Sequence, residues 1–215
     1  MDRFIAAAKR VNTSIPIHLE LASSGSLSLI RELATQVLPQ VDSMGLNEQE
    51  LGYLHFAITR PAASYSEASE YVSLHFKDPE LATVEQALKD VFEYVHRQPG
   101  ARKLERIHFH YLKYHLIAQT EDSSWLSPRA GVVAGSLEAT LQACGRNNSQ
   151  YLEWEHMEVL YPVDNPKEPY RHWRADGIHF HLAPLVACKY PVGTVGLGDT
   201  ISASGLSQQR RAAPQ

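Results

Sequence analysis

The amino-acid sequence predicts an α/β fold in which helices cover a β-sheet, and three observations lead to that prediction. Segments whose apolar residues alternate with polar ones take turns along the chain with segments whose apolar residues recur every three or four positions. Two further segments, 104–120 and 177–189, are rich in β-branched and aromatic residues. A turn with two glycines lies between an apolar run and a run of small residues, in 194-TVGLGDTISASGL-206. Such alternation of strands and helices is typical of layered α/β domains.

The first strand is predicted over 14-SIPIHLELA-22, because its apolar residues alternate with polar ones. This pattern places His18 and Glu20 together on the face opposite the apolar residues. After a small polar turn, residues 27–41 are predicted to form a helix. Its apolar positions, Leu29, Leu33 and Val37, recur every fourth residue.

A second helix is predicted to begin at Asn47 within residues 42–59. Asparagine is a favourable N-cap residue, and Glu48 and Glu50 in the first turn complement the helix dipole. Residues 60–79 are rich in serine, proline and alanine without a clear period, so we expect a loop. A strong amphipathic helix is predicted over residues 79–97. Its apolar face consists of Leu81, Val84, Leu88, Val91, Phe92 and Val95.

The segment 104–120 is predicted to be a strand that bends into a second strand segment. Residues 127–144 are predicted to form a helix with one apolar side. That side consists of Val133, Leu137 and Leu141. The stretch up to Tyr170 is expected to be irregular, apart from a short element in 151-YLEWEHMEVL-160.

The C-terminal part is predicted to contain a strand pair, a helix and a tail. Residues 177–189 are expected to form two strands with a bend around Pro184. A helix of small residues is predicted from Thr200 onward. The last residues, 207–215, are expected to form a disordered tail.

Length, charge and cysteine content exclude several classes of protein. A chain of 215 residues is one domain or a large part of one, and a net charge of −4 gives no electrostatic reason to expect nucleic acid. Cys144 and Cys188 lie in apolar contexts, which predicts buried thiols rather than a disulfide. No apolar run reaches the ~18 residues of a membrane span, and the N-terminus lacks the apolar region of a signal peptide.

The glycine turn is the first candidate site. If residues 192–195 end a strand and Thr200 begins a helix, the turn directs several backbone N–H groups and the positive helix end at one point. Gly196 and Gly198 permit unusual backbone angles and close approach by a ligand. Asp199 then lies at the helix start. Its carboxylate is either a base directed at an incoming hydroxyl group or a helix cap.

Two short motifs provide candidate metal ligands. His18 and Glu20 share one face of a strand, and Glu20 is suited to hold a magnesium ion through water. The alternative is that both residues face solvent on an edge strand. Asn47 and Glu50 are three residues apart on a helix, so one ion or water cluster can contact both. The alternative there is a capping box at the helix N-terminus.

Five blocks of the sequence together resemble the ADP-dependent glucokinases, most closely the animal form, within the ribokinase-like superfamily. The blocks are 18-HLELAS-23, 43-SMGLNEQEL-51, 106-RIHFHYLKYHL-116, 177-GIHFHLAPLVACK-189 and 194-TVGLGDTIS-202. The resemblance implies a three-layer ribokinase-like sandwich. It also implies that residues 1–206 are the C-terminal, nucleotide-binding part of such a kinase, without its N-terminal half and lid domain.

The resemblance implies a role for each residue of the glycine turn. The G-x-G-D motif of the family falls on Gly196, Leu197, Gly198 and Asp199. The backbone N–H groups of this loop, with Val195, would form an anion hole for the transferring phosphoryl group. Asp199 would be the general base on the sugar hydroxyl.

The two other motifs of the family are implied to organise magnesium. H-x-E falls on His18 and Glu20, with His18 in a supporting role, and N-x-x-E falls on Asn47 and Glu50. The implied reaction transfers the β-phosphoryl group of ADP to glucose with Mg²⁺ and gives glucose 6-phosphate and AMP. The implied partners are ADP, AMP and glucose, without nucleic acid, and the resemblance further implies a monomer associated with the endoplasmic reticulum.

Three other functions stay open at this point. The first possibility is a regulatory or inactive remnant that binds nucleotide weakly or not at all. The second possibility is ADP-dependent phosphofructokinase activity. The third possibility is a zinc hydrolase, because His108 and His110 on one strand and His179 and His181 on another form two H-x-H pairs. Histidines satisfied within a sheet are the alternative interpretation of these pairs.

Overall fold

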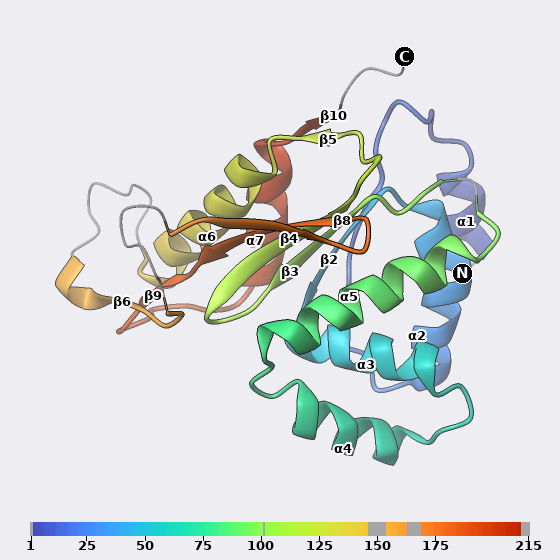
Figure 1. Ribbon diagram of the computed structural model, residues 1–215, viewed down its shortest axis with the longest axis horizontal. Helices are drawn as coiled ribbons and strands as arrows, with labels where there is room; N and C mark the ends of the chain where they lie inside the picture. Colours follow the sequence, from blue (N-terminus) through green and yellow to red (C-terminus); the bar gives the residue numbers. More distant parts are fainter. Residues whose placement is uncertain (1, 101, 146–153, 163–168, 212–215) are drawn as a thin grey trace. The chain divides into compact units, whose positions relative to one another are not determined.

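The computed structural model describes residues 2–100, 102–145, 154–162 and 169–211. It is a mixed α/β structure, as predicted from the sequence. The chain divides into two compact units, residues 1–107 and 108–213, and the division falls within strand β3, Arg106–His110 (Figure 1). Within the described ranges, no helix combines the length and the apolar character needed to cross a membrane.

The first unit combines a parallel strand pair with five helices among its described residues. Strand β1 pairs with β2 in parallel, with His18 opposite Ser43, and the beginning of β3 lies beside β2. The predicted helix over 27–41 is present, although it changes from α-helix to a π-helical turn and then to a 3₁₀ turn at Leu38–Gln40. The elements of this unit are α1 (Asp2–Ala8), β1 (His18–Glu20), α2 (Leu27–Glu32), β2 (Ser43–Asn47), α3 (Glu48–Thr59), α4 (Tyr65–His75), α5 (Leu81–His96) and the beginning of β3.

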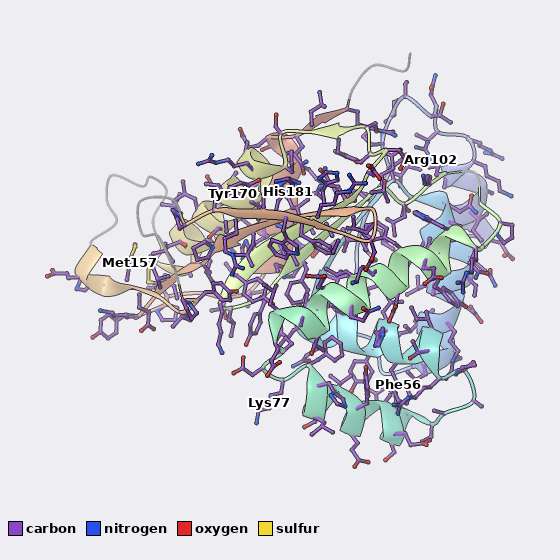
Figure 2. The ribbon with its side chains drawn as sticks, in the orientation of Figure 1. Phe56, Lys77, Arg102, Met157, Tyr170 and His181 are labelled. Atoms are coloured by element: carbon purple, nitrogen blue, oxygen red, sulfur yellow. A yellow bond between two sulfur atoms is a disulfide. The ribbon has the colours of Figure 1, made fainter. Side chains whose placement is uncertain are left out.

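The first strand is much shorter than the alternation of apolar residues predicts. Only the three residues of β1 are extended in a ladder, and Ile15 is 57% exposed. Side chains satisfy the backbone before β1, because the Asp42 carboxylate accepts a hydrogen bond from the Ile17 N–H at 2.7 Å. The Arg102 guanidinium, labelled in Figure 2, donates to the Ile15 carbonyl at 3.0 Å and pairs with Asp42. The segment therefore has no need of a partner strand.

Helix α4 corrects the prediction of a loop over residues 60–79. Ser64 and Glu67 form a capping box at its N-terminus, which satisfies two backbone N–H groups that have no partner within the helix. The helix buries only Ala68 and Val72, so its apolar period is too weak to be seen in the sequence. Tyr71 attaches it to α3, with its ring 5.3 Å from that of Phe56, which is labelled in Figure 2.

The helix predicted over 79–97 is confirmed as α5. Its predicted apolar residues are buried, apart from the half-buried Leu81 at its first position. This agreement has a physical reason, because α5 has a continuous apolar face, and burial of such a face is the main source of helix stability in a folded protein.

The second unit contains an antiparallel sheet and two long helices. Its strands follow the order β3-β4-β8-β7, and β8 pairs with both β4 and β7 in antiparallel register. The bend within 104–120 and the bend at Pro184 are both confirmed, whereas β7 was not predicted. The elements are β4 (Tyr114–Thr120), β5 (Trp125–Leu126), α6 (Pro128–Ala143), a 3₁₀ turn (Trp154–His156), β6 (Met157–Val159), β7 (Arg171–Ala175), β8 (Ile178–Pro184), β9 (Val186–Cys188), α7 (Leu197–Ser207) and β10 (Arg210–Arg211).

Of the three residues predicted to form the inward face of helix α6, Leu141 is buried, whereas Val133 and Leu137 are not. Val133 and Leu137 are 44% and 41% exposed, and both line an apolar cavity of about 870 Å³. Apart from Val132 and Leu141, the buried residues of the helix are small ones such as Gly131, Gly135 and Ala139. A Cβ atom on Gly205 of α7 would lie only 3.1 Å from the Gly131 carbonyl oxygen, so small residues are needed where the two helices meet.

The expected disordered tail is ordered in its first part. Ser207 ends α7, Gln209 is buried, and β10 pairs with β5 in antiparallel register. The Arg211 guanidinium donates to the Ser124 hydroxyl at 2.7 Å and lies 5.9 Å from the centre of the Trp125 ring. Residues 212–215 lie outside the described residues, as do 146–153 and 163–168 of the stretch predicted to be irregular.

Candidate functional site

The H-x-E motif lies on β1, and its two side chains meet as predicted. His18 and Glu20 are two residues apart on a strand, so both side chains leave the same face. The His18 Nε2 atom lies 3.3 Å from Glu20 Oε2, and both side chains are about one-fifth exposed, at 17% and 21%. The motif is therefore half-buried, and the alternative of a freely solvated edge strand does not describe it.

The N-x-x-E motif forms a capping box at the start of α3. The Glu50 N–H donates to Asn47 Oδ1 at 2.9 Å, and the Asn47 N–H donates to Glu50 Oε2 at 2.9 Å. The other oxygen of Glu50 accepts a hydrogen bond from the Ser23 hydroxyl at 3.3 Å. The structural alternative that the sequence offered is thus present, and the box holds Glu50 in one orientation, 7% exposed.

Arg106 also belongs to this region, although no sequence motif includes it among the candidate site residues. It begins β3, is fully buried, and donates from Nη1 to the Ser43 hydroxyl at 2.8 Å. Burial lowers the pKa of the Arg106 guanidinium to about 9, whereas the negative charge of Glu20 acts to raise it. An arginine at the start of a strand normally indicates a solvated strand end, so no sequence pattern marks this residue as internal.

The glycine turn lies at the start of α7, in the second unit. Gly196 is the N-cap residue with φ = +77°, a conformation that favours glycine. The helix begins at Leu197 rather than at Thr200, so Gly198 and Asp199 belong to its first turn. The predicted strand over 192–195 is absent, and that segment is exposed. The N–H groups of the first turn therefore have no partner within the helix, as an anion site requires.

Asp199 is an exposed residue in the first turn of α7, not its cap. The cap position belongs to Gly196, and no side-chain hydrogen bond caps this end. Gln142 of α6 holds the turn from one side, because its Nε2 donates to the Val195 carbonyl at 2.8 Å and its Oε1 accepts from the Thr200 hydroxyl. The cap interpretation of Asp199 is thus weakened, although an acidic residue in a first turn also complements the helix dipole.

The two H-x-H pairs lie in strands β3 and β8. The two glycines at the contact between α6 and α7, Gly135 and Gly205, leave just enough room for the buried His108 ring. Burial, together with the smaller effects of the neighbouring His172 and His179, lowers the pKa of His181 to about 3. Among the described residues, no group of three or more His, Cys, Asp or Glu side chains is arranged to hold a metal ion. The zinc-hydrolase interpretation therefore gains no support.

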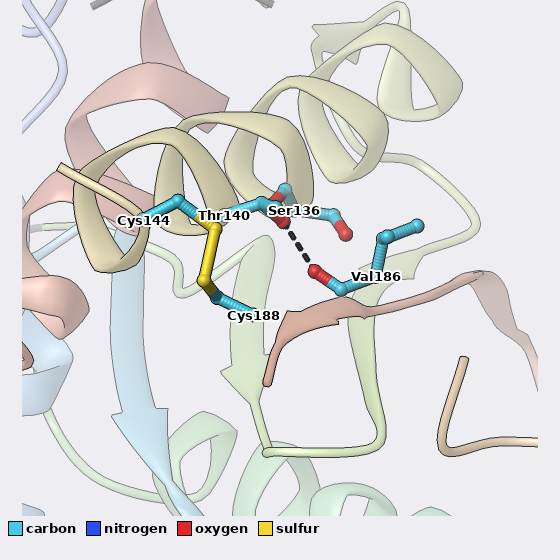
Figure 3. The surroundings of a disulfide bond; sticks show 5 residues. All are labelled: Ser136, Thr140, Cys144, Val186 and Cys188. Atoms are coloured by element: carbon cyan, nitrogen blue, oxygen red, sulfur yellow. Dashed lines mark hydrogen bonds between the residues drawn. A yellow bond between two sulfur atoms is a disulfide. The ribbon is translucent and has the colours of Figure 1, made fainter. Parts of the chain in front are cut away.

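The two cysteines form a disulfide, which corrects the prediction of two buried thiols. Cys144 is the C-cap residue of α6 and Cys188 ends β9, with their Cα atoms 5.7 Å apart (Figure 3). They are 44 residues apart in the sequence, so apolar context alone could not reveal the pairing.

The disulfide is the last of three evenly spaced links between α6 and the segment 184–188, which joins the end of β8 to β9. One turn earlier, the Thr140 hydroxyl donates to the Val186 carbonyl at 2.6 Å, as Figure 3 shows, and one turn before that the Ser136 hydroxyl donates to the Pro184 carbonyl at 3.2 Å. Four helical residues advance about 6.0 Å and two strand residues about 6.6 Å, so every fourth residue of the helix lies opposite every second residue of the strand. These contacts position the segment that leads to the glycine turn.

Comparison with solved structures identifies the fold of this chain. The ADP-dependent kinase in complex with fructose-6-phosphate and ADPβS superimposes with a TM-score of 0.66 at 19% identity, over 96% of this chain and 48% of that chain. A phosphofructokinase from Pyrococcus horikoshii OT3 with AMP gives a TM-score of 0.60 at 20% identity, over 89% of this chain and 41% of that chain. The chain thus has the fold of the ADP-dependent kinases.

Sequence comparison then identifies the family. Residues 1–208 match the model of the ADP-specific phosphofructokinase/glucokinase conserved region, so the chain belongs to the ADP-specific phosphofructokinase/glucokinase family. The ADP-dependent glucokinase of Bos taurus is 35% identical over 94% of this chain, and the probable ADP-dependent glucokinase of Caenorhabditis elegans is 29% identical over 92%. The chain spans 42% of the length of each of these two relatives.

Proposed function

We propose that this chain is the C-terminal, nucleotide-binding part of an ADP-dependent glucokinase. Such an enzyme transfers the β-phosphoryl group of ADP to glucose and gives glucose 6-phosphate and AMP. The observation that carries the proposal is the start of α7, where Gly196 in a left-handed conformation is followed by Leu197, Gly198 and Asp199 in the first helical turn. The free N–H groups of this turn and the helix dipole favour a phosphate group. The family match supports the reaction class.

In the proposed mechanism, Asp199 accepts the proton of the sugar hydroxyl. The hydroxyl oxygen forms the new bond to the β-phosphorus, the bond from that phosphorus to the bridging oxygen breaks, and AMP leaves with the electron pair. The N–H groups of Leu197 and Gly198 offset the negative charge on the transferring phosphoryl group. Such a transfer depends on positioning and charge stabilisation more than on covalent help from the protein.

Magnesium is the cofactor we propose, with Glu20 and Glu50 as its candidate carboxylates and Asn47 joined to Glu50 through the capping box. Both oxygens of Glu50 already accept hydrogen bonds, from the Asn47 N–H and the Ser23 hydroxyl. The residues present therefore fit an ion that retains several waters and needs only one or two carboxylates, which is how Mg²⁺ is usually bound. When bound, Mg²⁺ would neutralise charge on the phosphate groups.

Glucose is the proposed acceptor, and fructose 6-phosphate is the second candidate. The 35% identical relative is named a glucokinase, which favours glucose. The family also includes phosphofructokinases, and a solved complex of similar fold contains fructose 6-phosphate. Release of AMP from ADP, measured with either sugar, decides between them: the proposal expects more AMP with glucose, and AMP release with fructose 6-phosphate alone would contradict it.

Nucleotide binding is tested by thermal unfolding with magnesium and ADP, AMP or ATP. All three tryptophans, at positions 125, 154 and 173, belong to the second unit, so their fluorescence reports the unit that contains the glycine turn. A ligand bound only by the folded state at a hundred times its Kd stabilises that state by about 2.7 kcal/mol. We expect ADP and AMP to raise the melting temperature, and Asp199→Asn to keep this shift while losing AMP release. If no nucleotide changes the melting temperature, the chain is a remnant without the proposed activity.

A further inference from the structure

Four side chains of the first unit form a continuous chain of contacts that ends at the H-x-E glutamate. Arg106 Nη1 lies 2.8 Å from Ser43 Oγ, Ser43 Oγ lies 3.0 Å from His18 Nδ1, and His18 Nε2 lies 3.3 Å from Glu20 Oε2. Arg106 and Ser43 are fully buried, whereas His18 and Glu20 are half-buried. This series of contacts therefore leads from the interior of the unit to the accessible Glu20 carboxylate.

The hydrogen-bond donors and acceptors of these four side chains have only one arrangement in which each buried group has a partner. A guanidinium group has no acceptor atom, so Ser43 Oγ accepts from Arg106. The Ser43 hydroxyl also carries one hydrogen, which must find an acceptor because the residue is fully buried, and His18 Nδ1 is the remaining neighbour. His18 Nδ1 is then the acceptor, so the neutral ring carries its hydrogen on Nε2 and donates it to the Glu20 carboxylate.

The charge of Arg106 is a second link between this residue and Glu20. A buried guanidinium is costly without a negative partner, and the Glu20 carboxylate interacts with it favourably. Arg106 therefore acts on Glu20 in two ways, through its charge and through the hydrogen bonds that pass along Ser43 and His18. His55 provides a contrast in the same unit, because its two ring nitrogens form hydrogen bonds with Tyr71 and Asp90 rather than with these four side chains.

We propose that Arg106 is a positioning residue, which sets the Nε2–H tautomer of His18 through Ser43 and thereby holds the Glu20 carboxylate in one orientation. The role of the positioned carboxylate rests on the proposed function, in which Glu20 organises magnesium for the nucleotide. The tautomer itself does not depend on that function. Sequence motifs alone do not reveal this arrangement, because Arg106 and Ser43 lie 86 and 23 residues after Glu20.

The tautomer is tested by nitrogen-15 NMR of the histidine side chains at pH 8, above the ordinary histidine pKa of about 6.5. His18→Gln assigns the signal. We expect His18 to be the Nε2–H tautomer in the wild-type protein and in Arg106→Lys, which keeps a charged donor, and to lose this preference in Ser43→Ala and Arg106→Met. The His55 signal serves as the internal control and should not change. An Nδ1–H tautomer in the wild-type protein, or an unchanged His18 signal in folded Ser43→Ala, would refute the proposal.

The positioning role is tested by titrating ADP with Mg²⁺ and, separately, with EDTA. Loss of residues that orient metal ligands typically weakens metal binding by about 10–100-fold. We therefore expect Ser43→Ala to weaken ADP binding about tenfold with Mg²⁺ and not at all with EDTA, whereas a purely structural defect would weaken both. Equal affinities of Ser43→Ala and the wild-type protein with Mg²⁺ would overturn the positioning role. Absence of ADP binding by the wild-type protein would instead refute the proposed function, and the NMR result would still decide the tautomer.

Discussion

Removal of the Cys144–Cys188 disulfide should destabilise the second unit by about 4 kcal/mol. The bond closes a loop of 44 residues, and the loop-closure relation for a chain of that length gives this value for the entropy that the unfolded state regains. The hydrogen bonds of Ser136 and Thr140 to the strand remain when both cysteines become serine, so the folded geometry should be retained. The effect then arises almost entirely in the unfolded state.

Urea unfolding followed by tryptophan fluorescence measures this loss. All three tryptophans lie in the second unit, so the first unit does not contribute to the signal. The double serine variant should unfold at a lower urea concentration than the oxidised wild-type protein, and the wild-type protein with a reductant should match the variant. Thiol titration establishes that the wild-type sample is oxidised. If the oxidised protein and the variant then unfold at the same urea concentration, the loop-closure reasoning is wrong.

Two further predictions concern the same unit. Lowering the pH from 7 towards 4 should destabilise it, because burial lowers the pKa of His115 and His181 to about 3 in the folded state, whereas each takes up a proton near pH 6.5 when unfolded. The free energy of unfolding should keep its full value above about pH 6.5. Below that pH, each of the two histidines should lower it by up to about 1.4 kcal/mol for every pH unit. A urea midpoint that stays constant between pH 7 and 5 would contradict this prediction. Gly205→Ala should lower the free energy of unfolding by about 1–3 kcal/mol, because the added Cβ would lie 2.9 Å from the His108 ring. Gly193→Ala is the control and should leave the urea midpoint unchanged, because open space surrounds Gly193. Equal urea midpoints for the two variants would show that the contact between α6 and α7 is not tight.

The sequence predicts best those elements that have a strong pattern of their own. Helix α5 has a continuous apolar face, and α3 begins with a recognisable cap at Asn47, so both were predicted correctly. Helix α4 buries few apolar residues, so its sequence predicts a loop, although the spacing of Ser64 and Glu67 is itself a helix start signal. Its stability depends on contacts with α3 that no local pattern contains.

Tertiary contacts decide the features that the sequence could not predict. The apolar residues Val133 and Leu137 suggested the buried face of α6, but that helix meets α7 so closely that only small residues fit, and the two larger ones line a cavity instead. The cysteine pair and the burial of Arg106 have the same origin, since both depend on segments distant along the chain. The motif positions were thus predictable, and their immediate partners were not.

The three contacts between α6 and the strand end determine where insertions and deletions are tolerated. Because side chains of a strand alternate in direction, one residue added between Pro184 and Cys188 would turn the cysteine away from α6 and misalign the carbonyl of Val186. Two added residues would restore the direction but move the cysteine about 6.6 Å, beyond the reach of Cys144. In this short segment, length is therefore constrained more strictly than residue identity, and natural variation should consist of substitutions rather than gaps.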